Sequence, residues 1–124
     1  MKPSHLLACL VLGAASMAAL AADAPAKLVD GALVSAKGMT LYTFDKDTAG
    51  SGKSACNGPC AKLWPPLMAG ASDQPSDDWS IVAREDGTRQ WAYKGKPLYH
   101  YQEDEKAGQR GGDNFKKVWH IIKE

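Results

Sequence analysis

The sequence of 124 residues is 44% hydrophobic and 23% charged, with 15 Lys and Arg against 14 Asp and Glu. This composition is typical of one small globular domain. The balanced charge, without a cluster of Lys or Arg, argues against nucleic acid as the main partner, because phosphate binding requires a concentrated basic surface.

Residues 1–22 have the pattern of a secretory signal peptide. Lys2 precedes an apolar run over residues 6–20, and small residues follow it, so we expect cleavage after Ala21 or Ala22. The run is about 15 residues long, too short to cross roughly 30 Å of hydrocarbon comfortably, and no second apolar stretch follows. We therefore expect an exported protein with no transmembrane segment after cleavage. It would be periplasmic in a Gram-negative cell and secreted or on the cell surface otherwise.

The rest of the chain contains an internal repeat. Residues 37–47 align with residues 94–104 at a constant offset of 57, and both segments share the pattern K-G-x-x-L-Y-x-(F/Y)-x-x-D. We therefore expect residues 23–124 to form a single domain of two copies of one unit. Unit one is predicted over residues 27–67 and unit two over residues 79–124, and residues 68–78 are the predicted linker.

The sequence pattern of each unit predicts a β-meander, because Asp-Gly and Lys-Gly dipeptides supply the positive φ that tight hairpin turns require. The expected fold class is all-β, with two fused antiparallel β-meander units packed in one small domain. Outside the signal peptide, no segment shows a sustained helical period. The predicted strands are residues 27–29, 32–36, 39–44, 80–84, 89–93, 97–101 and 117–122, with one helical turn near residues 59–62.

Aromatic residues follow the strand alternation in both units. The pairs that share a strand face are Tyr42 with Phe44, Tyr99 with Tyr101, and Trp91 with Tyr93. Burying one such ring removes roughly 150–250 Å² from water, so we expect the aromatic residues to supply much of the core. The same alternation places His100 and His120 on faces away from the main aromatic stripe.

Two of the three cysteines remain after signal cleavage. Cys9 lies in the signal peptide, whereas Cys56 and Cys60 form a CxxxC pair in an exported chain, where a disulfide is the default interpretation. Closing this small ring would stabilise the fold by about 2 kcal/mol on the chain-entropy model. The pair could also be an exchangeable redox pair. As a further alternative, it could bind a copper ion together with His100 or His120.

The repeated pattern, the segment over residues 54–67 and the duplication resemble the secreted-repeat family of predicted bacterial lipoproteins with a Yx(F/W/Y)xxD motif. The resemblance covers residues 28–122. The family is described as having no established function, so it implies export and repetition but no activity. Unlike a lipoprotein, this chain has no cysteine at the predicted cleavage point. The motif positions are Tyr42, Phe44 and Asp47, and again Tyr99, Tyr101 and Asp104.

The motif has two interpretations. Asp47 and Asp104 could accept backbone N–H bonds in the turns that follow, or they could form two related acidic, aromatic pockets. The sequence contains no catalytic motif such as G-x-S-x-G or H-E-x-x-H, so we predict no enzyme activity and no cofactor. The leading hypothesis is a non-catalytic envelope binding or interaction module for an unknown ligand or protein. The alternative is a periplasmic redox or copper-handling protein.

Overall fold

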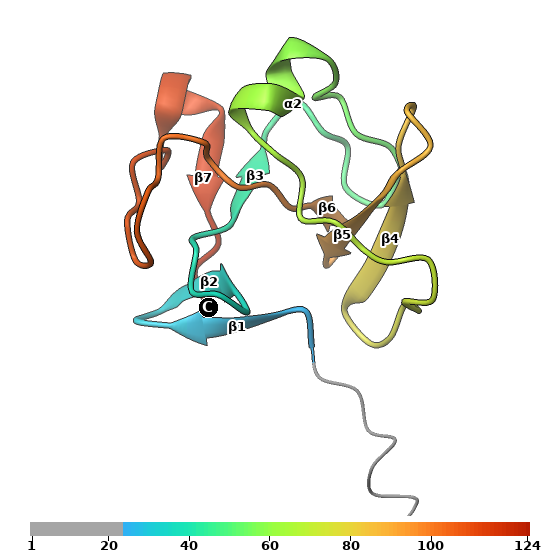
Figure 1. Cartoon of the computed structure of the whole chain (residues 1–124), viewed down its shortest axis with the longest axis horizontal. Coiled ribbons are helices and arrows are strands. Elements are labelled where there is room, and N and C mark those ends of the chain that lie inside the picture. Colours follow the sequence, from blue (N-terminus) through green and yellow to red (C-terminus); the bar gives the residue numbers. More distant parts are fainter. Residues whose placement is uncertain (1–23) are drawn as a thin grey trace, which may run out of the picture.

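A computed structural model describes residues 24–124, and the predicted signal peptide lies outside the described residues. In this part of the chain, short strands and two short helices are joined by long stretches of turn and irregular backbone (Figure 1). The strands are β1 (Ala26–Val29), β2 (Ala32–Ser35), β3 (Tyr42–Phe44), β4 (Trp79–Ala83), β5 (Arg89–Tyr93), β6 (Lys96–Pro97) and β7 (Trp119–Ile121). The helices are α2 (Pro59–Leu63) and the 3₁₀ helix η1 (Phe115–Lys117).

Hairpin turns form where the dipeptides predicted them. Asp30 and Gly31 have φ of 52° and 79° between β1 and β2, and Lys94 and Gly95 have φ of 50° and 84° between β5 and β6. Strands β4, β5 and β6 form an antiparallel three-stranded meander, and β1 pairs antiparallel with β2. The predicted fold class, a β-dominated chain of two antiparallel units, is thereby confirmed.

The two units exchange strands, which the hairpin pattern did not predict. Strand β3 of unit one pairs antiparallel with β7 at the end of unit two, and Figure 1 shows the two strands side by side. At the centre, Tyr42 and Tyr99 exchange both backbone hydrogen bonds, at 2.8 and 3.0 Å. Beyond Tyr99, the amide of His100 donates to Pro65 of unit one at 2.6 Å. The motif segment of each unit therefore pairs with the closing segment of the other.

The motif segments separate two hydrophobic clusters. Tyr42 and Tyr99, both fully buried, pack with Trp64, Trp119 and the disulfide loop on one side. Their neighbours Leu41 and Leu98, also fully buried, belong to a second cluster. Because successive side chains of an extended strand point to opposite faces, each motif segment contributes to both clusters. The second cluster also contains Ala26, Leu33, Leu67 and Trp91.

Within residues 24–124, no helix has the length and apolar character that crossing a bilayer requires.

Candidate functional site

The tyrosine and aspartate of the repeated motif bond crosswise between the units. The Tyr42 hydroxyl donates to Asp104 Oδ2 at 2.5 Å, and the Tyr99 hydroxyl donates to Asp47 Oδ2 at 2.6 Å. The second oxygen of each carboxylate accepts a backbone N–H from the following loop, at 2.6 Å from Ala55 and at 2.9 Å from Gly111. Each motif aspartate therefore holds its own loop and the tyrosine of the other unit.

Burial and hydrogen bonding determine the charge state of these groups. Burial raises the pKa of Tyr42 and of Tyr99 far above the usual phenol range, and the adjacent carboxylates raise it further. Both hydroxyls therefore stay protonated and act as donors. Burial also raises the pKa of Asp47, against the opposing effects of its hydrogen bonds with Tyr99 and Ala55.

Four aromatic rings stack across the boundary between the units. Phe44 lies 4.1 Å from Trp119, Trp119 lies 3.8 Å from Trp64, and Trp64 lies 4.4 Å from Tyr101, measured between ring centroids. Units one and two alternate along this stack. The motif aromatics and the closing tryptophans therefore fill the interior with little space for a ligand between them.

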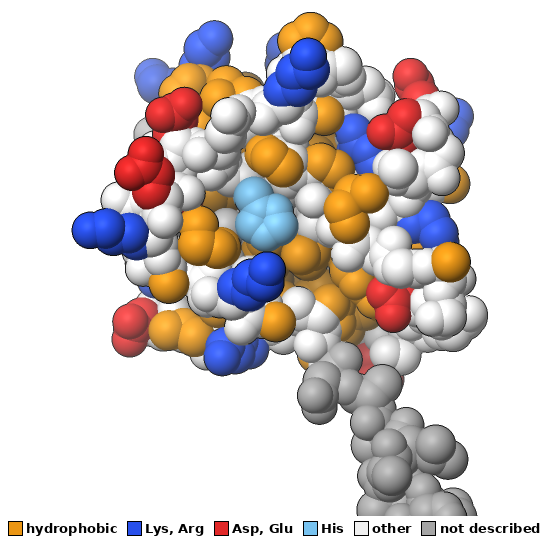
Figure 2. Space-filling model, viewed as in Figure 1, with side chains coloured by type: hydrophobic (Ala, Val, Ile, Leu, Met, Phe, Trp, Pro, Cys, Tyr) orange, Lys and Arg blue, Asp and Glu red, His pale blue; other side chains and the backbone are white. Residues whose placement is uncertain are grey.

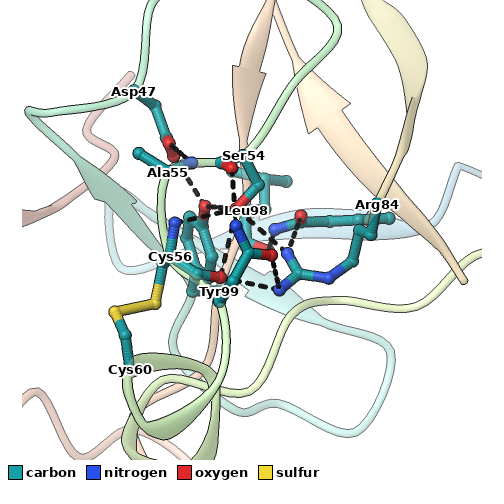
Figure 3. The surroundings of a disulfide bond; sticks show 10 residues. Asp47, Ser54, Ala55, Cys56, Cys60, Arg84, Leu98 and Tyr99 are labelled. Atoms are coloured by element: carbon teal, nitrogen blue, oxygen red, sulfur yellow. Dashed lines mark hydrogen bonds between the residues drawn. A yellow bond between two sulfur atoms is a disulfide. The ribbon is translucent and has the colours of Figure 1, made fainter. Parts of the chain in front are cut away.

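The CxxxC pair forms the disulfide that the sequence predicted, Cys56–Cys60. Helix α2 begins at Pro59, where the missing N–H of proline costs no hydrogen bond. Cys56 is fully buried and Cys60 is half-buried, so the bond closes a loop against the core beside Tyr99 (Figure 3).

A buried arginine, Arg84, holds this loop to unit two (Figure 3). Its guanidinium donates at 2.6 Å to the Cys56 carbonyl, at 3.0 Å to the Ser54 hydroxyl and at 2.6 Å to Gln90 Oε1. Ser54 in turn lies 2.6 Å from the Tyr99 hydroxyl, so a chain of hydrogen bonds runs from the guanidinium to Asp47. Sequence reasoning did not single out Arg84, because an arginine beside a hairpin turn usually faces solvent.

Neither histidine forms a hydrogen bond with the cysteine loop; the His100 amide donates to Pro65, and the His120 ring lies beside Asp45. His100 is half-buried, and burial lowers its pKa. His120 Nε2 lies 2.9 Å from Asp45 Oδ2, across the β3–β7 pair. Within the described part of the chain, no three His, Cys, Asp or Glu side chains gather into a group that could hold a metal ion. The ligand set considered for copper, Cys56 and Cys60 with His100 or His120, is therefore not assembled in residues 24–124.

A cleft of about 560 Å³ lies between the start of β4 and the preceding loop. We call it the acidic–aromatic cleft, after six of the residues that line it. In Figure 2, hydrophobic side chains line a hollow just above the grey residues, and acidic side chains lie beside it. The six side chains are Trp79, Trp91 and Tyr93, with Asp73, Asp77 and Asp78.

Strand register brings the three aromatic rings of the cleft together. Trp79 is paired with Tyr93 across β4 and β5, and Trp91 lies two residues before Tyr93 on the same face. The Trp79 ring centroid is 6.0 Å from that of Trp91 and 4.9 Å from that of Tyr93. Strand alternation predicted that Trp91 and Tyr93 share one face, but no pattern in the sequence indicated Trp79, which follows the predicted linker directly.

A tight turn positions two of the carboxylates. The backbones of Ser76 and Trp79 exchange hydrogen bonds at 3.0 and 2.8 Å, so Asp77 and Asp78 occupy the tip of the turn. Asp77 has φ of 52°, a left-handed conformation that Asp and Asn tolerate better than most residues. Asp73 is half-buried and accepts a hydrogen bond from the Gly70 amide at 2.7 Å. All three aspartates lie in the predicted linker, residues 68–78.

The fold defines a class, a strand-dominated domain of two repeats that exchange strands. The chain belongs to the family described as a secreted repeat of unknown function, whose pattern matches residues 26–68 and 80–123. This match confirms the family membership that the resemblance predicted. No curated protein and no solved structure matches the chain significantly.

Proposed function

We propose that this exported protein is a non-catalytic binding module of the cell envelope and that the acidic–aromatic cleft is its ligand site. Export agrees with the description of the family as secreted. The observation that carries the proposal is the combination of three aromatic rings and three carboxylates around a cleft of about 560 Å³. Binding sites for small molecules are clefts in which apolar and aromatic surfaces hold the ligand and polar groups orient it.

The other conspicuous residues of the chain already have internal partners. Tyr42, Tyr99 and both motif aspartates bond to one another across the units, and Arg84 bonds to the cysteine loop. These groups stabilise the fold, because a buried polar group is tolerated only when it is hydrogen-bonded. In contrast, Trp79 and Tyr93 are half-buried at the surface, and Asp77 and Asp78 are exposed. The cleft therefore offers side chains that a ligand can reach.

The four tryptophans provide an internal control for a binding test. Trp79 and Trp91 line the cleft, whereas Trp64 and Trp119 stack in the interior. We would record the indole N–H signals of ¹⁵N-labelled protein, recovered from the periplasm of an expression host, during titration with choline, cellobiose and the peptide Gly-Phe-Gly. We expect at least one probe to shift the Trp79 and Trp91 signals while those of Trp64 and Trp119 stay in place.

A variant provides the second arm of this test. Trp79→Ala should abolish the shift of the Trp91 signal, while Met68→Ala, which also removes a partly exposed apolar side chain, should preserve it. If none of the three probes moves the cleft signals at millimolar concentration, or if all shifts fall on Trp64 and Trp119, the proposal is wrong.

A further inference from the structure

The charged side chains that line the acidic–aromatic cleft all carry the same sign. Asp73, Asp77 and Asp78 line it, and among the described residues that line it none is Lys, Arg or His. Carboxylates on one side of a cleft with low-dielectric walls concentrate a negative potential there. This field attracts cations and repels anions, so the charge favours a positively charged ligand.

The aromatic rings favour the same charge. The ring of Trp79 stands at 82° to Trp91 and at 45° to Tyr93, so the three rings form a corner rather than a flat platform. The face of an aromatic ring carries partial negative charge, and Trp binds cations more strongly than Tyr or Phe. A flat platform would suit the planar faces of a sugar, whereas a corner of rings suits a compact, rounded cation.

One ring of the cleft already has a cation near it. The Lys94 ammonium lies 5.3 Å from the centroid of Tyr93, within the range of a cation–π interaction. Lys94 also pairs with Glu124 at 3.3 Å, so this cation is held outside the cleft, which Lys94 does not line. The local environment of Tyr93 is therefore compatible with a positive charge.

The positions of the carboxylates indicate the kind of cation. Asp77 and Asp78 are exposed at the rim, and one oxygen of Asp73 accepts the Gly70 amide. Ser72, Gln74 and Ser76 also line the cleft, but the ring faces themselves offer no acceptor to a primary ammonium with three N–H donors. A quaternary ammonium has no N–H donor and is weakly hydrated, so it can leave water for ring faces at low cost.

From these observations we propose that the acidic–aromatic cleft binds a quaternary ammonium group. Trp79, Trp91 and Tyr93 contact its methyl groups, and the three aspartates attract its charge. This inference rests on the proposed function, since it names the ligand chemistry of the same cleft.

Choline and its uncharged analogue 3,3-dimethyl-1-butanol test the inference, because they have the same shape and differ in charge. We expect choline to shift the indole signals of Trp79 and Trp91 and to bind about tenfold more tightly than the analogue. Raising NaCl from 0.05 to about 0.5 M should weaken choline binding, since exposed carboxylates are screened at the higher salt concentration.

The turn of the cleft has a matched control elsewhere in the chain. Asp77→Asn removes one charge at a left-handed position with φ of 52°, and Asp30→Asn makes the same change at φ of 52° in the β1–β2 turn. Asn tolerates this conformation, so both variants should fold. We expect Asp77→Asn to weaken choline binding about threefold and Asp30→Asn to leave it unchanged.

The outcomes separate the inference from the proposed function. Equal binding of choline and its neutral analogue would overturn the inference. So would cellobiose shifting the cleft signals while choline does not, although the cleft would then remain a ligand site. Equal effects of Asp77→Asn and Asp30→Asn would also contradict it. If no probe moves the Trp79 and Trp91 signals, both the inference and the proposed function fail.

Discussion

At the residue scale, the crossed bonds of Tyr42 with Asp104 and of Tyr99 with Asp47 give the family motif a physical explanation. The motif tyrosine needs its hydroxyl because a carboxylate of the other unit depends on it as a donor. The second aromatic needs only a ring for the interior stack, which is why Phe44 and Tyr101 can stand at equivalent positions.

Tyr42→Phe should therefore destabilise the protein by about 1–3 kcal/mol, since it removes one donor from the buried Asp104 carboxylate. The same substitution also removes the acceptor of the Gly112 amide. The free energy of unfolding in urea measures the effect. Tyr101→Phe is the matched control, because within residues 24–124 no hydrogen bond of its hydroxyl is formed. Equal losses for the two variants would contradict the explanation.

At the scale of elements, the loop closed by Cys56 and Cys60 is held from two directions. The disulfide joins it to α2, and Arg84 joins it to the hairpin of β4 and β5. The guanidinium is buried, and its two terminal nitrogens donate to neutral acceptors, whereas its Nε has no hydrogen-bond partner within the described residues. Asp47 is reached only through Ser54 and Tyr99. Its removal would leave Gln90 Oε1 without a donor, and the Cys56 carbonyl would keep only the 3.3 Å bond from the Ser54 hydroxyl.

Arg84→Met is expected to lower the free energy of unfolding by about 3 kcal/mol, because it removes the donor of Gln90 Oε1 and the 2.6 Å bond to the Cys56 carbonyl at once. Arg84→Lys should recover only part of the loss, since one ammonium cannot reproduce the planar fork of a guanidinium. Arg110→Met, at an exposed arginine that donates to the Asp30 carbonyl, is the control and should change stability little. Urea midpoints compare the three variants, and a small effect of Arg84→Met would show that the hydrogen bonds around the loop are dispensable.

At the scale of the whole molecule, the two units are interlocked rather than placed side by side. Strand β3 pairs with β7, Tyr42 pairs with Tyr99, and the central ring stack takes Trp64 from one unit and Trp119 from the other. Each unit alone would expose its own part of both hydrophobic clusters, and a fragment of this size buries too little surface to fold readily by itself.

We expect the fragments 24–71 and 72–124, separated in the exposed loop, to be unfolded alone and to fold when mixed. Two stacked indoles couple electronically and give a paired circular dichroism band when their in-plane transition dipoles are rotated relative to each other. The native stack requires Trp64 from one fragment and Trp119 from the other. The band should therefore appear only after mixing. A first fragment carrying Trp64→Phe is the control that should fold without the band. The band in either fragment alone would show that the units fold independently.

The sequence by itself determined the local features. The turns at Asp30-Gly31 and Lys94-Gly95, the helix start at Pro59 and the Cys56–Cys60 bond all depend on neighbouring residues, so their patterns predicted them. Short runs of alternating residues likewise predicted the strands to within a few residues.

Only the tertiary structure decided which strands pair. Because the two motif segments share one pattern, β3 could find an equivalent partner within its own unit or in the other, and the sequence pattern does not distinguish these choices. The exchange buries Tyr42 against unit two and Tyr99 against unit one. Which pairing is more stable depends on the packing of the whole core and not on the motif segments alone. Arg84 and the acidic–aromatic cleft escaped prediction for the same reason, since their partners come together only after distant segments have packed.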